Sequence, residues 1–251
     1  MGRVLRQLAL FIPDLRGGGA ERVMLILADA FHSRGFDVDL VVARSIGEYR
    51  SMVPDGVRLV DLGTRRLREV PWHLARYLRA KRPPALLSAY DQLNVLAVAA
   101  RKLARVNTRL VCTVHVHLSN HLRLTGRSLH SWLLKRFLSA AFSSADHTVC
   151  VSQGVARDLV ATVGVSSDRV SVIYNPVLVD RIRSLARQPV DHPWFEKGAP
   201  PVVLGVGRLH PEKDFPNLMR AFALLRRERV ARLVILGEGS ERAFLERLAD
   251  E

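Results

Sequence analysis

The fold is decided by a stretch near the N-terminus, residues 8–22, which reads LALFIPDLRGGGAER. A short apolar run at 8–12 precedes a turn with three consecutive glycines, and a helical pattern follows that turn. This order is typical of a buried strand whose carboxyl end leads directly into a helix. The stretch therefore indicates an α/β protein, in which the same order of strand, turn and helix should recur along the chain.

The same alternation of apolar runs and helical patterns continues over the first 173 residues. Strand-like runs stand at 8–12, 38–42, 58–60, 85–89, 109–114, 147–151 and 170–173. Helical patterns stand at 21–34, 72–81, 93–104, 128–142 and 154–163. Strands that are apolar throughout and alternate with amphipathic helices indicate a parallel sheet covered on both faces. We predict a doubly wound, Rossmann-like domain that binds its ligands outside the carboxyl ends of its strands.

The alternation breaks after Asn175-Pro176 and restarts beyond a proline-rich segment. New strands are expected at 202–206 and 232–236, and new helices at 215–227 and 241–249. Two such units, about 50 residues, cannot bury a full core alone. We therefore expect a first domain over 1–187, a linker over 188–200, and an incomplete second domain over 201–251.

Composition narrows the class of protein. The chain has 251 residues, of which 48% are hydrophobic and 25% are charged, which is typical of a globular protein and not of a disordered or collagen-like chain. Cys112 and Cys150 lie in strand-like apolar runs and suit buried positions in a reducing, cytoplasmic setting. No apolar run reaches 18 residues, and the N-terminal one is too short for a signal peptide, so no membrane-spanning helix is expected.

The net charge of +14 is concentrated in one part of the chain. From His192 onward there are 10 basic and 9 acidic residues, so the first 191 residues carry +13. Two stretches, 65–82 and 121–142, mix arginines and lysines with Trp72, Trp132 and several leucines. Such stretches suit an anionic membrane surface, and they equally suit a solvated basic face around a packed apolar stripe. No nucleic-acid-binding motif is present, so no nucleic acid is expected as a partner.

The glycine turn is the first candidate site. Gly17, Gly18 and Gly19 allow a ligand to approach the backbone, and a helix N-terminus attracts phosphate or carboxylate groups. A flexible turn without a ligand explains the same residues. The turn lacks the G-x-G-x-x-G spacing of dinucleotide-binding proteins, which argues against a nicotinamide-dependent dehydrogenase.

A second candidate is a group of histidines at and beyond the end of the run at 109–114. His115 stands where a doubly wound sheet places its ligands, and it can hydrogen-bond a substrate or transfer a proton near neutral pH. Simple packing is the alternative. His115, His117 and His121 do not predict a metal site, because no acid or cysteine accompanies them.

Two turns of the C-terminal segment are further candidates. Arg208 and Lys213 stand between a predicted strand and helix, where two cations beside a helix N-terminus suit a diphosphate. A solvated turn with unrelated charges is the alternative. Residues 236–240, LGEGS, repeat the order of strand, glycine turn and helix.

Taken together, these segments resemble glycosyltransferase family 4. The segments are GGGAER at 17–22, His115 with Leu118-Ser119, ADHTVCVS at 145–152, VIYNPV at 172–177, GVGRL at 205–209 with Lys213-Asp214-Phe215, and LVILGEG at 233–239. The resemblance implies the GT-B architecture of two facing Rossmann-like domains. It also implies retaining transfer of a hexosyl group from a nucleotide-diphosphate sugar to a cell-surface glycan or lipid-linked acceptor.

The resemblance also implies roles for residues. Gly18 and Gly19 face the donor phosphates, His115 approaches the transferred sugar, and Arg208 with Lys213 holds the diphosphate. Further candidate contacts with the sugar or nucleotide are Gly17, Glu21, Asn175, Gly237 and Glu238. No metal or other cofactor is expected, because cations and helix dipoles can stabilise the leaving diphosphate.

The sequence departs from the family pattern at its end. Family members continue with further strand and helix units and with two glutamates eight residues apart. We therefore expect a truncated chain that does not transfer sugar efficiently alone, located in the cytoplasm or peripherally on the inner face of the membrane. A non-catalytic or split binding module, completed by another polypeptide, is the alternative.

Overall fold

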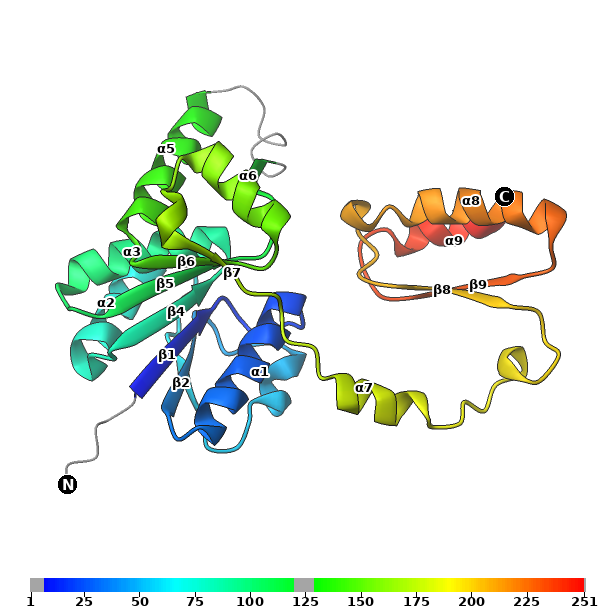
Figure 1. Ribbon diagram of the computed structural model, residues 1–251, viewed down its shortest axis with the longest axis horizontal. Coiled ribbons are helices and arrows are strands. Elements are labelled where there is room, and N and C mark those ends of the chain that lie inside the picture. Colours follow the sequence, from blue (N-terminus) through cyan, green and yellow to red (C-terminus); the bar gives the residue numbers. More distant parts are fainter. Residues whose placement is uncertain (1–6, 120–128, 251) are drawn as a thin grey trace. The chain divides into compact units, whose positions relative to one another are not determined.

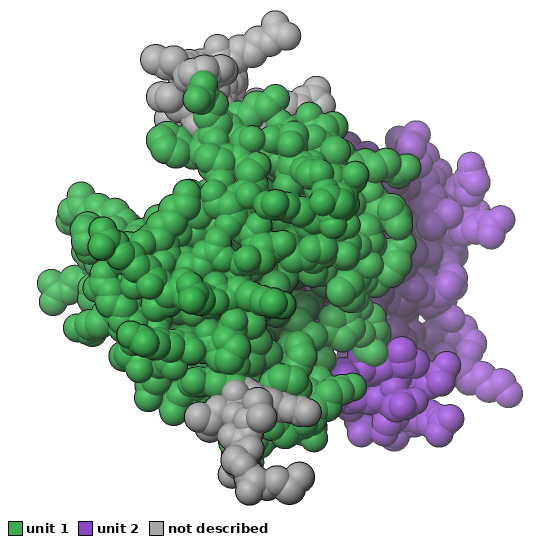
Figure 2. Space-filling model, turned by 60° about the vertical axis from the view of Figure 1, so that its left-hand side comes forward, with its two compact units in different colours: residues 1–177 green, residues 178–251 purple. Residues whose placement is uncertain are grey.

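A computed structural model of the protein describes residues 7–119 and 129–250, with residues 129–134 described through their backbone. The chain divides into two compact units, residues 1–177 and 178–251, which Figure 2 shows in separate colours. Within the described residues, no helix is both long and apolar enough to span a bilayer.

The first unit is built on a parallel sheet (Figure 1). Its strands are β1 (Gln7–Ile12), β2 (Asp37–Val42), β3 (Arg58–Asp61), β4 (Ala85–Ala89), β5 (Arg109–Val114), β6 (His147–Cys150) and β7 (Val170–Val172). The strands lie in the order β3-β2-β1-β4-β5-β6-β7, and every neighbouring pair is parallel. The predicted doubly wound α/β fold is confirmed, and no strand end differs from its prediction by more than one residue.

Helices cover both faces of this sheet, which explains why its strands are apolar throughout. The helices are α1 (Gly19–Ser33), α2 (Val70–Lys81), α3 (Asp91–Ala104), α5 (Leu129–Ser144) and α6 (Gln153–Val163). Short 3₁₀ turns lie at Glu48–Met52, Leu67–Glu69 and Ser167–Arg169. Leu10 packs with Met24 of α1 on one face, whereas its neighbour Phe11 packs in the cluster that contains Leu74 of α2. All four of these side chains are fully buried.

The direction in which the chain is wound changes between β1 and β4. From β1 the chain passes through α1 to β2, and it later returns through α2 to β4, on the other side of β1. Ligands of such sheets bind outside the carboxyl ends of the strands at this reversal. The turn after β1 and the turn after β4 therefore flank the expected binding crevice.

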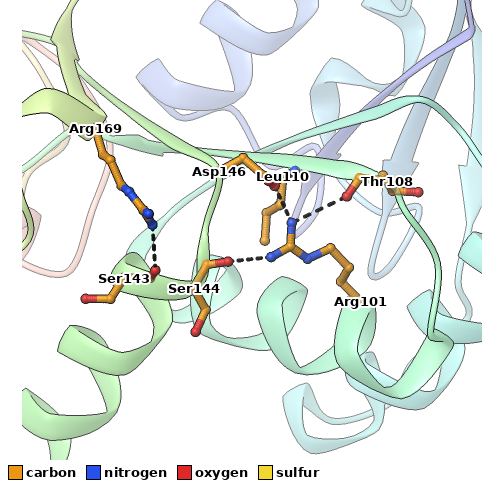
Figure 3. Close-up of polar contacts among 7 residues, drawn as sticks. All are labelled: Arg101, Thr108, Leu110, Ser143, Ser144, Asp146 and Arg169. Atoms are coloured by element: carbon orange, nitrogen blue, oxygen red, sulfur yellow. Dashed lines mark hydrogen bonds and ion pairs between the residues drawn. The ribbon is translucent and has the colours of Figure 1, made fainter.

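Arg101 of α3 fixes the strand that carries His115. Its guanidinium bonds the Asp146 carboxylate and the Ser144 carbonyl oxygen, and it also contacts the Thr108 carbonyl oxygen at 3.4 Å (Figure 3). The Asp146 carboxylate also accepts from the Leu110 backbone N–H at 2.7 Å, and the Asp146 N–H donates to the Leu110 carbonyl oxygen at 2.9 Å. The start of β5 is thereby joined to the start of β6 and the end of α5.

The second unit is smaller. Its elements are α7 (Val179–Ala186), β8 (Val202–Val206), α8 (Phe215–Glu228), β9 (Arg232–Leu236) and α9 (Arg242–Asp250), with 3₁₀ turns at Pro193–Phe195 and Pro211–Lys213. β8 and β9 pair in parallel. A core of Leu209, Phe215 and Leu245 lies on the helix-covered face of this sheet, beside a cavity of about 770 Å³.

The other face of the β8–β9 sheet is uncovered within the described residues: Leu204 is 56% exposed and Val206 is 70% exposed. The second unit begins at Leu178 and thus includes α7, whereas the sequence placed the first domain boundary at 187 and the linker at 188–200. Helix α7 was not predicted. The assignment of the two units as acceptor-side and donor-side domains stays a prediction.

Candidate active site

The glycine turn after β1 is held by a second loop. The Leu15 N–H donates to the Ile46 carbonyl oxygen at 2.8 Å, and the Tyr49 N–H donates to the Leu15 carbonyl oxygen at 2.8 Å. Gly47 allows this close approach, because its φ is +120° and a Cβ there would meet the Leu15 backbone. The turn that enters α1 is therefore braced, which argues against the flexible-turn alternative.

Gly17, Gly18 and Gly19 differ in what a side chain at each position would meet. Gly17 has a φ of +98°, which strains any residue with a Cβ, and the Tyr49 ring lies 3.6 Å from the position of that Cβ. At Gly18, a Cβ would meet the Glu21 carboxylate and would lie 3.2 Å from the Tyr90 hydroxyl. Nothing lies within 4 Å of a Cβ at Gly19, so the first turn of α1 is open there.

Glu21 occupies the N-terminal turn of α1. Glu21 is only 5% exposed, and its Oε2 has no hydrogen-bond partner among the described residues. A carboxylate is favourable at the positive end of a helix dipole. Any phosphate bound at Gly18 and Gly19 would share that positive end with Glu21.

Tyr90 lies beside the glycine turn and was not identified from the sequence. It follows β4 directly and caps α3 with a φ of +77°, which is strained for a tyrosine. Such strain is found at functional sites. Its position at the carboxyl end of a predicted strand is the signal that could have found it.

His115 lies directly beyond β5, two strands from β1, or about 10 Å across the sheet. Its ring is half-buried, and its Nε2 lies 3.0 Å from the Thr113 hydroxyl oxygen. Burial lowers the pKa of His115, because desolvation disfavours the imidazolium form. The ring is therefore neutral at physiological pH and is positioned at the same sheet edge as the glycine turn.

His117 and His121 were the other two histidines considered for a metal site. His117 Nδ1 lies 3.9 Å from the Asp158 carboxylate, which also accepts from the Ser119 N–H at 3.1 Å. His121 lies outside the described residues. Within residues 7–119 and 129–250, no group of three histidine, cysteine, aspartate or glutamate side chains is arranged to hold a metal ion.

The predicted residues of the second unit form their own group. The Gly207 N–H donates to the Leu236 carbonyl oxygen at 3.0 Å, so the ladder between β8 and β9 continues into the turns. Lys213 runs past Gly207, since its Cδ and Cε lie 3.7 Å from a Cβ placed there. Lys213 and Arg208 are both exposed, and neither forms an ion pair with any described residue.

The remaining candidates differ in their surroundings. A Cβ at Gly237 would meet the Gly207 carbonyl oxygen, so Gly237 is required for the two turns to pack together. Glu238 is exposed and pairs with Arg242 one turn later in the chain. Asn175 is exposed in the segment that follows β7. Gly237 is thus explained by packing, and a role in ligand binding for these three residues stays a prediction.

The basic stretch at 65–82 is partly a packed stripe. Leu74, Tyr77 and Leu78 of α2 are buried in the core, whereas Trp72 is 66% exposed and Leu67 is 47% exposed. The arginines at 65, 66, 68 and 76 are exposed around them. In the second stretch, residues 121–128 and the side chains of 129–134 lie outside the described residues.

The fold and these residues define an α/β protein with a glycine turn, Tyr90 and His115 at the carboxyl ends of its strands. It also has a second strand–turn–helix unit in which Arg208 and Lys213 are exposed. The chain belongs to Glycosyltransferase Family 4, whose model matches residues 17–181. The model of Glycosyl transferases group 1 matches residues 188–251. The resemblance found in the sequence is thereby confirmed.

A curated relative from Campylobacter jejuni subsp. jejuni serotype O:2 is 27% identical over 248 residues. It is N-acetylgalactosamine-N,N'-diacetylbacillosaminyl-diphospho-undecaprenol 4-alpha-N-acetylgalactosaminyltransferase, and the match covers 94% of this chain and 63% of the relative. This chain thus spans less than two thirds of the relative's length.

Solved structures support the same fold. Anabaena HepE in complex with UDP-glucose matches with a TM-score of 0.71 and 16% identity, covering 97% of this chain and 64% of that one. WaaG, a glycosyltransferase involved in lipopolysaccharide biosynthesis, matches with a TM-score of 0.65 and 15% identity, covering 97% and 66%. At these identities the likeness concerns the fold.

Proposed function

We propose that the protein takes part in transferring a hexosyl group from a nucleotide-diphosphate sugar to a cell-surface glycan or lipid-linked acceptor. The observation that carries this proposal is the braced glycine turn at the reversal of the sheet, with His115 at the same edge. Membership of Glycosyltransferase Family 4 supports the reaction class. The name of the Campylobacter relative, which specifies a diphospho-undecaprenol acceptor, supports the lipid-linked alternative.

In this proposal each group of residues has one task. In the first unit, the open backbone at Gly19 and the positive end of α1 suit a donor phosphate. In the second unit, Arg208 and Lys213 suit a diphosphate. His115 contacts the sugar. Cations such as Arg208 and Lys213 stabilise the negative charge that develops on a leaving diphosphate, so we propose that the reaction needs no metal or other cofactor.

The test separates binding from turnover. The purified 251-residue chain is titrated calorimetrically with nucleoside diphosphates and their glucose, galactose and N-acetylhexosamine conjugates. We expect saturable binding of one nucleotide series. Transfer is then measured with radiolabelled donor and a polyprenyl-diphosphate sugar. Binding without transfer would favour the binding-module alternative, and the absence of nucleotide binding would overturn the proposal.

We also propose that the protein lies at the inner face of the cytoplasmic membrane through the surface formed by Leu67, Trp72 and the arginines at 65, 66, 68 and 76. These residues follow the carboxyl end of β3, which is the edge of the sheet that carries the site. An exposed tryptophan among cations suits an anionic interface, where each cation contributes about 1 kcal/mol.

Flotation with vesicles tests this surface. We expect the protein to float with phosphatidylglycerol vesicles and to remain at the bottom with phosphatidylcholine vesicles. Trp72→Ala reduces flotation, whereas Val230→Ala, which truncates a side chain that is 73% exposed in the second unit, leaves it unchanged. Equal flotation of both variants would count against the surface.

A further inference from the structure

The Thr113 hydroxyl lies between two groups at the edge of the sheet. It donates to the Ser88 carbonyl oxygen across 3.1 Å, and its oxygen lies 3.0 Å from His115 Nε2. Thr113 is 6% exposed and Ser88 is fully buried, so the hydroxyl and the carbonyl oxygen are shielded from water, whereas His115 is half-buried. The Thr113 side chain on β5 therefore joins β4 to His115.

The proton count at this hydroxyl leaves one arrangement in which both contacts are hydrogen bonds. A threonine hydroxyl carries a single proton and two lone pairs, and a carbonyl oxygen can only accept. Since the hydroxyl proton goes to the Ser88 oxygen, the Thr113 oxygen acts as the acceptor toward His115. Nε2 must then be the donor in that contact.

We propose that Thr113 is a positioning residue that holds neutral His115 as its Nε2–H tautomer, so that Nδ1 is left as a hydrogen-bond acceptor for a ligand hydroxyl. The assignment of the ligand group rests on the proposed function, whereas the assignment of the tautomer does not. In a neutral imidazole one nitrogen donates and the other accepts. Fixing one role therefore fixes the other.

The surroundings of Thr113 are rigid enough to hold this arrangement. Fully buried Asn94 of α3 donates its side-chain amide to the Thr113 carbonyl oxygen at 3.0 Å. The register between β4 and β5 places Ala89 opposite Thr113 and Ser88 opposite Cys112. The Thr113 backbone is thus held by a helix, and its hydroxyl is held by the neighbouring strand.

The arrangement determines what His115 can bind. A ring nitrogen with a free lone pair accepts from a hydroxyl or an N–H group, and it repels the lone pairs of a phosphate or carbonyl oxygen. Burial favours the neutral ring, so Nδ1 does not become a donor near neutral pH. His115 is thereby specific for a sugar hydroxyl over the diphosphate.

The tautomer is measured without any ligand. The chain is labelled with ¹⁵N-histidine, and long-range ¹H–¹⁵N correlation spectra are recorded at pH 7.5, with His115→Gln used to assign the signal. We expect Nε2 at the shift of a protonated ring nitrogen and Nδ1 at the shift of an unprotonated one. The opposite pattern, or two nitrogens with averaged shifts, would overturn the proposal.

Three variants connect the tautomer to Thr113. Thr113→Val removes the hydroxyl at nearly constant shape, so the two ring shifts should move toward each other as both tautomers become populated. Thr113→Ser restores the hydroxyl and the original pattern. Thr148→Val is the matched control, because Thr148 is a buried threonine on β6 whose hydroxyl has no partner among the described residues.

An unchanged His115 signal in Thr113→Val would show that Thr113 does not set the tautomer. A change of the same size in Thr148→Val would show a general disturbance of the sheet and would also count against the proposal. If the tautomer is as expected but no nucleotide sugar binds, the assignment to Thr113 stands and only the proposed function falls.

Discussion

Tyr77 of α2 donates its phenolic proton to the buried carboxylate of Asp39 on β2 across 2.6 Å. The same carboxylate bonds Arg58 of β3 at 2.6 Å. Two strands and a helix are thus joined at one carboxylate, which is only 2% exposed. The site at the carboxyl ends of the strands depends on a sheet that is held together near the amino ends.

We expect Asp39→Ala to destabilise the protein more than Tyr77→Phe does. Tyr77→Phe removes one hydrogen bond and costs about 1 kcal/mol, whereas Asp39→Ala leaves the buried Tyr77 hydroxyl without its acceptor and costs about 2–4 kcal/mol. Urea unfolding followed by circular dichroism measures both. Asp37→Ala, at an exposed position on the same strand, should leave the midpoint nearly unchanged. Equal losses in all three variants would contradict this account.

Stability should fall in alkaline solution because of the two cysteines. Burial raises the pKa of the Cys112 thiol to about 12 and that of the Cys150 thiol to about 11. Above the unfolded pKa of about 8.5, the unfolded chain releases these protons first, so unfolding becomes more favourable as the pH rises toward the folded values. The slope approaches about 1.4 kcal/mol per pH unit for each thiol.

Urea midpoints between pH 7.5 and 10 test this dependence. Cys112→Ala should be less stable at pH 7.5, because it leaves a cavity, but its stability should fall less steeply with pH than that of the unaltered protein. Tyr77 contributes a further decline above pH 10, since burial and the Asp39 carboxylate raise its pKa. Parallel curves for the variant and the unaltered protein would rule the explanation out.

The glycines of the turn should separate stability from binding. Gly17→Ala places a Cβ at a φ of +98° and should cost about 1 kcal/mol or more of stability. Gly19→Ala meets no atom within 4 Å and should leave stability unchanged or slightly higher, because alanine favours helices. Its methyl group should nevertheless weaken nucleotide-sugar binding severalfold. Thermal unfolding and calorimetric titration of both variants provide the comparison.

Arg208 and Lys213, two of the exposed cations of the second unit, should contribute to diphosphate binding. Arg208→Ala and Lys213→Ala should each raise the Kd for a nucleoside diphosphate about tenfold, since each removes a charge-assisted hydrogen bond of about 1.5 kcal/mol or more. Arg227→Ala, an exposed arginine at the far end of α8, is the control for net charge. A similar loss of affinity in Arg227→Ala would show that the effect comes only from the long-range field of the net charge.

Most of the fold could be predicted, because burial on both faces of the sheet produces the apolar runs of β1, β4 and β5. Helix α7 was missed although Val179, Ile182 and Leu185 recur at helical spacing, and none of its residues is buried. Tyr49 and Tyr90 were missed for another reason. Tyr49 reaches the glycine turn because the loop after β2 pairs with Leu15, and Tyr90 reaches it because the chain returns to β4. Both tyrosines are far from the turn in sequence, so no local pattern predicts these contacts.

The sequence by itself determined the alternation of strands and helices, the position of the glycine turn and the family, because these follow from local periodicity and short motifs. Tertiary structure alone decided that the Tyr90 hydroxyl lies beside Gly18, that Thr113 bonds both Ser88 and His115, and that Trp72 stays exposed while Leu74 is buried. The physical reason is that strand order and register bring together groups from different strands. A hydrogen bond or a buried contact depends on that proximity, which no local pattern encodes.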